Sequence, residues 1–171
     1  FAPCITFLNA RETNDVWYTA VLPVTKQESV LGKCLLVVIF QLFQLLFSIP
    51  FALMRNVLQI PNNPVGLDAT VAWYGFGFIL YAVFDLVFLT VFYKDGYKVG
   101  KSSILAAIPM VFLMVMIEAT VHIPALVWMD SFQPKDLLMQ LPILIAGIVC
   151  YGVLVPFVYR ISAKRFKKVD L

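Results

Sequence analysis

Three ionisable residues lie inside long apolar stretches of the sequence, where a charge is costly. Asp85 falls in the apolar run 70–93, and Glu118 and His122 fall in the run 104–129. A charged side chain at the centre of a bilayer costs from about 2.5 kcal/mol on insertion scales to far more in simulations, so such residues face a bundle interior or a wet cavity. Asp85 and Glu118 are therefore candidates for lining a transport pathway.

Each of these acids also has a plain structural interpretation. Glu118 and His122 are four residues apart, hence on one face of a helix, and could simply satisfy each other near one membrane surface. Asp85 could satisfy a polar group of a neighbouring helix. We interpret His122 as a structural partner of Glu118 rather than as a proton switch.

Two glutamines, Gln41 and Gln44, lie three residues apart on one face of the apolar run 34–54. Buried glutamines usually hydrogen-bond across a helix interface, and that is the interpretation we favour. Lining a pathway is the alternative, so both glutamines join Asp85, Glu118 and His122 as candidate pathway residues.

The sequence offers little for enzyme chemistry. It contains a single histidine, which excludes the H-E-x-x-H arrangement of zinc peptidases and leaves no basis for a catalytic triad. Its three cysteines, Cys4, Cys34 and Cys150, lie in or beside apolar segments without the spacing of a metal site, and their odd number gives no disulfide framework. We predict no catalytic residues and no metal site.

One segment resembles a nucleotide-binding motif without meeting its requirements. Residues 95–102, D-G-Y-K-V-G-K-S, match the pattern G-x-x-x-x-G-K-S except that Asp95 replaces the first glycine. That chemistry needs a strand before the loop and a glycine that lets backbone N–H groups surround the phosphates. Here an apolar helix is predicted before the loop, and an aspartate would repel phosphate. We expect this chain to bind no ATP and no other cofactor.

The composition is that of a membrane protein. Of the 171 residues, 61% are hydrophobic and 13% are charged, against about half and about a quarter in soluble domains. A hydrocarbon core of about 30 Å needs roughly 20 helical residues, and four apolar windows are long enough: 34–54, 70–93, 104–129 and 137–159. They do not alternate with period two, which argues against a barrel. We predict an all-α, polytopic transmembrane helical bundle, with the third window interrupted by Pro109 and Pro124 and broken at its outer end.

Basic residues divide the loops into two sets. Three segments, 11–33, 94–101 and 160–168, hold eleven of the thirteen lysines and arginines, and the remaining loops hold only Arg55 and Lys135. The positive-inside rule places the three basic segments, including the C-terminus, in the cytoplasm. The net charge of +3 therefore reflects membrane topology, and we do not expect nucleic-acid binding.

The polar segment before the first long apolar window carries two helix-start signals. Asp15 is a good N-cap for a short helix over 16–22, which Pro23 must end. Thr25-Lys26-Gln27-Glu28 then reads as a T-x-x-E capping box. A second helix is therefore expected to start near Lys26 and to continue into the membrane.

Residues 1–8 are apolar but too short to cross a membrane. We interpret them as the end of a preceding spanning helix. The sequence does not show the pattern of a signal peptide, which is a basic start followed by an apolar stretch and a small-residue cleavage site. We expect an N-terminal portion with one or two further helices to be missing from the sequence.

The segment 14–33 is similar to the loop between the second and third membrane helices of type-2 ABC transporter permeases. In that family the loop reads as a tryptophan, then L-P, a small hydroxyl residue and a basic residue, and then V-x-G-K entering the third helix. The matching positions here are Trp17, Leu22, Pro23, Thr25, Lys26, Val30, Gly32 and Lys33.

The resemblance implies a six-helix permease of which this chain holds helices two to six. Residues 1–8 would end the second helix, 9–33 would form a cytoplasmic coupling-helix region, and 34–171 would form the single transmembrane domain with its basic tail. The broken stretch 118–133 would correspond to the family's re-entrant outer helices.

The resemblance also implies partners. These are an ATP-binding-cassette ATPase, which would hold ATP and Mg²⁺, and a second permease that is either identical or different, in the bilayer of a bacterial plasma membrane. The residues implied in coupling to the ATPase are Asp15, Trp17, Tyr18, Leu22, Pro23, Thr25, Lys26, Glu28, Gly32 and Lys33. Compact permeases of this kind export amphipathic or antimicrobial peptides, such as phenol-soluble modulins, or confer immunity to them.

Two other classes of function remain open. A membrane sensor or scaffold would need no ATPase partner. A membrane-embedded enzyme would need Asp85, Glu118 and His122 to converge, although the sequence places Asp85 in the inner half of the membrane and His122 in the outer half.

Overall fold

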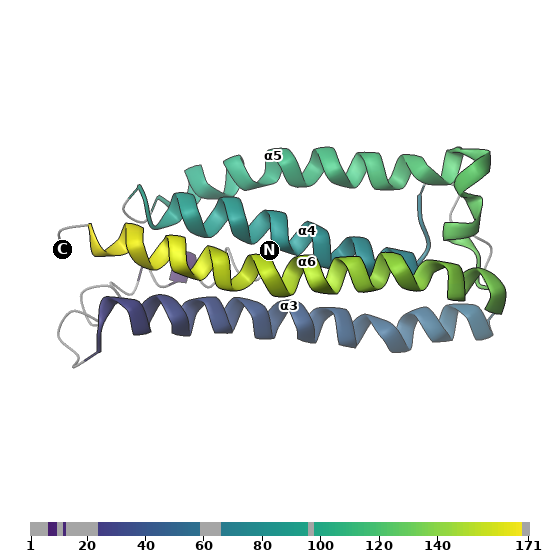
Figure 1. Ribbon diagram of the computed structural model, residues 1–171, viewed down its shortest axis with the longest axis horizontal. Coiled ribbons are helices and arrows are strands. Elements are labelled where there is room, and N and C mark those ends of the chain that lie inside the picture. The colour runs from purple at the N-terminus through teal and green to yellow at the C-terminus, as the bar shows by residue number, and fades with distance from the viewer. Residues whose placement is uncertain (1–6, 10–11, 13–23, 59–65, 96–97, 169–171) are drawn as a thin grey trace.

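The computed structural model describes residues 7–9, 12, 24–58, 66–95 and 98–168, and the predicted coupling helix over 16–22 lies outside them. Four long helices run side by side along the molecule (Figure 1). They are α3 (Lys26–Val57), α4 (Val71–Phe92), α5 (Val99–Glu118) and α6 (Pro134–Lys167), with two short 3-10 helices, η1 (Ala119–His122) and η2 (Pro124–Asp130), between α5 and α6. No strand occurs in these ranges, so the predicted all-α polytopic bundle is confirmed.

Successive helices alternate in direction, which gives the bundle two distinct ends. The basic end holds the start of α3, the loop from α4 to α5, and the end of α6, and the distal end holds η1 and η2 (Figure 1). The three basic segments predicted to share one side of the membrane therefore gather at one end, as far as they are described.

The helix α4 is the centre of the bundle. It packs on α6, α5 and α3, whereas no Cα atom of α3 lies within 8 Å of one of α5 within the described residues. The α4–α6 contact depends on two glycines: a Cβ on Gly147 would lie 2.2 Å from the Gly75 carbonyl oxygen, and a Cβ on Gly75 would lie 2.6 Å from the Ile143 carbonyl oxygen. Small residues of this kind let membrane helices approach at backbone distance.

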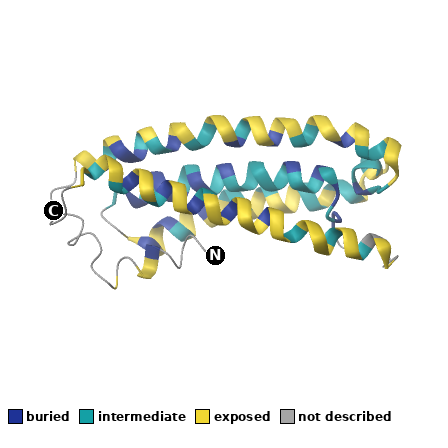
Figure 2. Cartoon of the chain, turned by 90° about the horizontal axis from the view of Figure 1, so that it is seen from below, coloured by how far each residue is buried: buried dark blue, intermediate teal, exposed yellow. Residues whose placement is uncertain are grey.

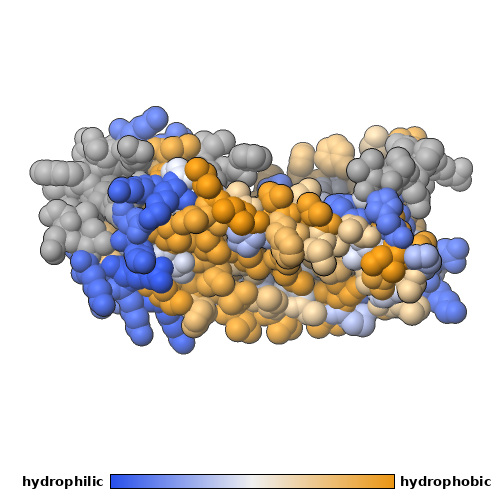
Figure 3. Space-filling model, turned by 90° about the horizontal axis from the view of Figure 1, so that it is seen from above, coloured by the Kyte–Doolittle hydropathy of each residue, from blue (hydrophilic) through white to orange (hydrophobic). Residues whose placement is uncertain are grey.

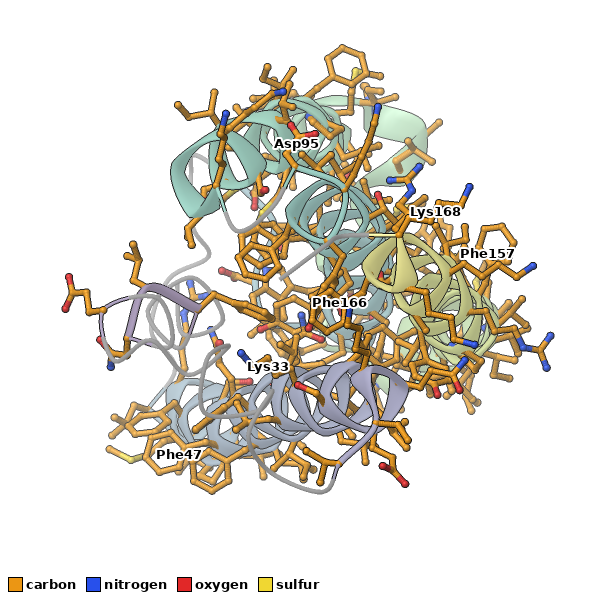
Figure 4. The ribbon with its side chains drawn as sticks, turned by 90° about the vertical axis from the view of Figure 1, so that its left-hand side faces the viewer. Lys33, Phe47, Asp95, Phe157, Phe166 and Lys168 are labelled. Atoms are coloured by element: carbon orange, nitrogen blue, oxygen red, sulfur yellow. The ribbon has the colours of Figure 1, made fainter. Side chains whose placement is uncertain are left out.

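The outer surfaces of the bundle are apolar. Exposed residues follow the outside of the helices (Figure 2), and an apolar band separates two polar ends (Figure 3). Viewed from the basic end, Phe47 and Phe157 point outward while Phe166 points into the bundle (Figure 4). All four long helices have the length and composition to cross a membrane; the 22 residues of α4 span about 33 Å at 1.5 Å per residue, close to a hydrocarbon core of about 30 Å. The chain is a multi-pass membrane protein.

The start of α3 confirms the predicted capping box. The backbone N–H of Thr25 donates to a Glu28 carboxylate oxygen at 2.7 Å, and the backbone N–H of Glu28 donates to Thr25 Oγ1 at 3.2 Å. Because this cap lies ahead of the apolar window, α3 is longer than the window 34–54 at both ends. An apolar window marks the part of a helix in hydrocarbon, and not the helix ends.

The third and fourth windows differ from their predicted forms. The helix α5 continues through Pro109, so the predicted interruption there is wrong. Membrane helices tolerate proline because neighbouring groups and local adjustments satisfy the freed carbonyl. Pro124 does mark a break, because it opens η2. The predicted basic tail is a continuation of α6, which ends at Lys167.

Phe7 belongs to an aromatic cluster at the basic end. Its ring lies edge-on to Phe88 and Phe92 of α4 and to Tyr93, with centroid distances of 5.2, 4.6 and 6.5 Å. Residues 7–9 are helical, as expected for the end of a helix. Residues 1–6 lie outside the described residues.

Candidate functional site

A buried polar network joins three helices in the middle of the bundle. Gln41 of α3 donates from Nε2 to Asp85 Oδ1 of α4 at 2.8 Å, and the hydroxyl of Tyr151 on α6 donates to Gln41 Oε1 at 2.6 Å. Asp85 and Gln41 are only 2% and 3% exposed. The predictions that Asp85 faces the interior and that Gln41 hydrogen-bonds across a helix interface are confirmed.

Tyr151 was not among the candidate residues. The signal that could have found it is its hydroxyl, which stands in the apolar window 137–159 and needs a polar partner there. The network is therefore made of three residues whose polar groups are costly in hydrocarbon and which satisfy one another.

A second polar network closes the distal end of the bundle, and it binds the segment 66–70 that precedes α4. The backbone N–H of Leu67 donates to Glu118 Oε2 at 2.6 Å, and the backbone N–H of Asp68 donates to Asp130 Oδ1 at 2.7 Å. Thr70 Oγ1 donates to the Met129 carbonyl at 2.8 Å. The segment is thus held by the end of α5 and by η2.

Arg55, at the distal end of α3, forms an ion pair with Asp68 and ties a third helix to this network. Burial raises the pKa of the Asp130 carboxyl above its ordinary value, and the neighbouring carboxylates of Asp68 and Glu118 raise it further, while the Asp68 amide and Arg55 act against this. The network therefore combines the carboxyl groups of Asp68, Asp130 and Glu118 with one arginine, which pairs with Asp68.

Gln140 of α6 connects the start of α4 to η2 at the distal end of the bundle. It is fully buried, and its Oε1 accepts the Ala72 backbone N–H at 3.1 Å. Its Nε2 donates to the carbonyls of Trp128 and Ser131 at 2.8 and 3.0 Å. One side chain thus satisfies a backbone donor in the first turn of α4, which has no partner within its own helix, and two carbonyls in and after η2.

The predicted pairing of Glu118 with His122 is not what the structure shows. The α-helix ends at Glu118, and the chain continues as the 3-10 helix η1, so the two residues do not share an α-helical face. Glu118 instead accepts the Leu67 N–H, and His122 is exposed on η1 with no hydrogen bond to Glu118 in the described part of the chain.

An apolar cavity of 270 Å³ lies on the distal half of α4, between α3 and α5. Its walls combine aromatic and methionine side chains with three polar residues, and the lining consists of Gln44, Leu45, Trp73, Phe76, Gly77, Leu80, Tyr81, Met110, Met114, Ile117 and Glu118. Two of the five candidate pathway residues, Gln44 and Glu118, therefore share one cavity. Gln41 and Asp85 belong to the buried network. His122 belongs neither to that network nor to the lining of the cavity.

Only part of the predicted coupling segment lies within the described residues. Thr25 and Glu28 form the cap of α3, the Lys26 ammonium lies 5.7 Å from the centroid of the Phe166 ring, and the Lys33 ammonium lies 5.8 Å from that of Phe7. A Cβ on Gly32 would meet no other group within 4 Å. Asp15, Trp17, Tyr18, Leu22 and Pro23 lie outside the described residues.

The segment that resembles a nucleotide-binding motif follows α4, a helix, as predicted. Lys101 forms an ion pair with Asp95, and the hydrogen bond from Lys101 holds the pKa of the Asp95 carboxyl below its ordinary value. Val99 opens α5, so Gly100, Lys101 and Ser102 are part of its first turn.

Comparison with models of protein families gives one match, over residues 2–166, to the family described as ABC-2 family transporter protein. No curated protein and no solved structure matches the chain significantly. The family match includes the segment that resembles the coupling loop, all four spanning helices and both polar networks. The chain therefore belongs to the ABC-2 family of transporter proteins and is a type-2 ABC transporter permease.

Proposed function

We propose that this permease is the membrane subunit of an exporter for amphipathic or antimicrobial peptides, driven by a separate ATP-binding-cassette ATPase. In this proposal the basic end faces the cytoplasm and residues 9–33 dock onto the ATPase. A second permease, identical or different, completes the transporter. The permease itself moves substrate and catalyses no reaction.

The observation that carries the proposal is the continuity of α3 from the docking segment to the centre of the bundle. The capping box of Thr25 and Glu28 opens the helix at the basic end, and four turns later Gln41 of the same helix binds Asp85 and Tyr151. A displacement of the N-terminus of α3 would therefore reach α4 and α6 through two hydrogen bonds. Such coupling requires the ATPase to have different affinities for two states of the permease.

The apolar lining of the distal cavity supports an amphipathic substrate. Eight of its lining residues are Leu, Ile, Met, Phe or Trp side chains or glycine, and the polar ones are Gln44, Tyr81 and Glu118. Ligand sites of this kind combine apolar walls with a few polar groups that fix orientation.

Co-purification of the complete protein with its bound partners tests the proposal. We expect a soluble ATP-binding-cassette ATPase to co-purify, and we expect its binding to be lost when residues 14–33 are replaced by a flexible linker of equal length. A permease that purifies without an ATPase from gentle detergent would favour a sensor or scaffold function and would contradict the proposal.

A further inference from the structure

The charged and aromatic residues that line the distal cavity restrict the chemical class of ligand that it can bind. Of the residues that line it, Glu118 is the one acidic residue, and none is Lys, Arg or His. Three aromatic side chains, those of Trp73, Phe76 and Tyr81, form part of the walls. Aromatic faces attract cations, most strongly where water is excluded, and the methionines add polarisable sulfur that adapts to apolar shapes.

The volume limits the size of the ligand. At 270 Å³, the cavity lies just below the range of about 300 to 1,000 Å³ that is usual for drug-sized ligands. It can hold a single ring or one long side chain with its neighbour, but not a peptide helix. The cavity lies between α3 and α5, and within the described residues no Cα atom of α3 lies within 8 Å of one of α5.

Glu118 connects the cavity to the distal network. Its Oε2 accepts the Leu67 N–H at 2.6 Å, and a Cβ on Gly66 would lie 1.8 Å from the same oxygen, so the backbone of 66–67 lies directly against the carboxylate. A carboxylate has about four acceptor positions, and one backbone N–H occupies a single one. A cation bound in the cavity would compete with the Leu67 N–H for the carboxylate of Glu118.

We propose that the distal cavity binds a small apolar organic cation, or a cationic side chain with its apolar neighbour from a longer substrate, and that Glu118 links its occupancy to the segment 66–70. The cation lies against Trp73, Phe76 and Tyr81 with its charge toward Glu118. The weakened contact to Leu67 then favours opening of the distal end. This assignment rests on the proposed exporter function in taking the bound cation to be part of the cargo.

A pair of isosteric probes tests the assignment on the complete protein with its ATPase in lipid nanodiscs. Benzyltrimethylammonium carries a positive charge, and neopentylbenzene has the same shape without it. We expect the cation to bind about tenfold more tightly than the neutral probe by isothermal titration, a difference that corresponds to about 1.4 kcal/mol. Equal affinities, or no binding of the cation, would overturn the assignment.

Variants separate charge from structure. Glu118→Gln keeps an oxygen that can accept the Leu67 N–H and removes the charge, so we expect it to abolish the preference for the cation and to leave the neutral probe unaffected. Asp136→Asn, which removes an acid at the distal start of α6 outside the cavity, should change neither affinity. If Glu118→Gln does not fold, Met114→Trp, which fills the cavity from α5, should abolish binding of both probes. Retention of the preference in Glu118→Gln, or of binding in Met114→Trp, would refute the site.

Peptide-stimulated ATP hydrolysis, measured on the same preparations, separates the two proposals. Stimulation without cation binding would overturn the cavity assignment and leave the exporter function standing. Cation binding without any stimulated hydrolysis would overturn the exporter function and leave the cavity as a cation site.

Discussion

Gln41 and Asp85 lie 44 residues apart in the chain and are joined at the centre of the bundle by a hydrogen bond of 2.8 Å. Gln41 also accepts a hydrogen bond from Tyr151, so its amide contacts both α4 and α6. A second hydrogen bond, from Ser48 Oγ of α3 to the Tyr74 hydroxyl of α4 at 3.1 Å, joins the same two helices nearer the distal end.

Replacement of this glutamine provides a prediction with a matched control on the same helix. We expect Gln41→Leu to lower the free energy of unfolding by about 1 to 3 kcal/mol, because it leaves the buried Asp85 carboxyl and Tyr151 hydroxyl without their partner. Gln44→Leu should have little effect, since Gln44 is exposed to the cavity and makes no hydrogen bond within the described residues. Thermal unfolding in detergent measures both, and equal losses would contradict the role assigned to Gln41.

The glycine contact between α4 and α6 gives a second prediction. Gly147→Ala places a methyl group 2.2 Å from the Gly75 carbonyl oxygen, so the helices must separate. We expect a loss of about 1 to 3 kcal/mol, as for overpacking of a core. Gly152→Ala on the same helix meets nothing within 4 Å and should be neutral or stabilising, because alanine favours a helix over glycine by about 1 kcal/mol. Similar thermal transitions for the two variants would refute the close contact.

The distal network predicts how stability depends on pH. The pKa of Asp130 is raised in the folded protein above the ordinary value of 3.8, chiefly by burial. The folded state therefore binds this proton more tightly than the unfolded state does, and the stability it contributes is fully present below the ordinary value and is lost as the pH rises through the raised value.

Asp130→Asn removes this titration and keeps an oxygen that can accept the Asp68 N–H. We expect the wild type to lose stability relative to Asp130→Asn as the pH rises from the ordinary value of 3.8 through the raised pKa of Asp130. Asp95→Asn serves as a control of opposite sign, because the lowered pKa of Asp95 stabilises the folded state above its ordinary value and ceases to do so as the pH falls. Parallel stability profiles for the wild type and Asp130→Asn would contradict the burial of that carboxyl.

The features that were predicted from the sequence depend on short-range patterns. The four apolar windows predicted the four long helices, and the T-x-x-E spacing of Thr25 and Glu28 predicted the start of α3. A charge in an apolar window predicted that Asp85 is buried, because burial away from lipid is the only inexpensive solution for it.

The features that were missed depend on contacts between distant residues. Tyr151 lies 110 residues from its partner Gln41, and Asp130 lies 62 residues from the amide that it binds. No periodicity in one sequence records such pairs. The predicted pairing of Glu118 with His122 failed for a related reason, because it assumed an α-helix across the position where the chain changes to a 3-10 helix. The predicted interruption at Pro109 was wrong because a membrane helix tolerates a proline, and α5 continues through it.

We propose that an ATPase drives this permease through residues 9–33. Its most direct test is peptide-stimulated ATP hydrolysis by the reconstituted complex with Trp17→Ala, compared with Phe157→Ala, which removes an aromatic side chain that points outward from α6 (Figure 4). We expect Trp17→Ala to abolish the peptide-stimulated component of ATP hydrolysis without changing the thermal transition of the permease, and Phe157→Ala to retain that component. Full stimulation in a folded Trp17→Ala complex would contradict the coupling assignment.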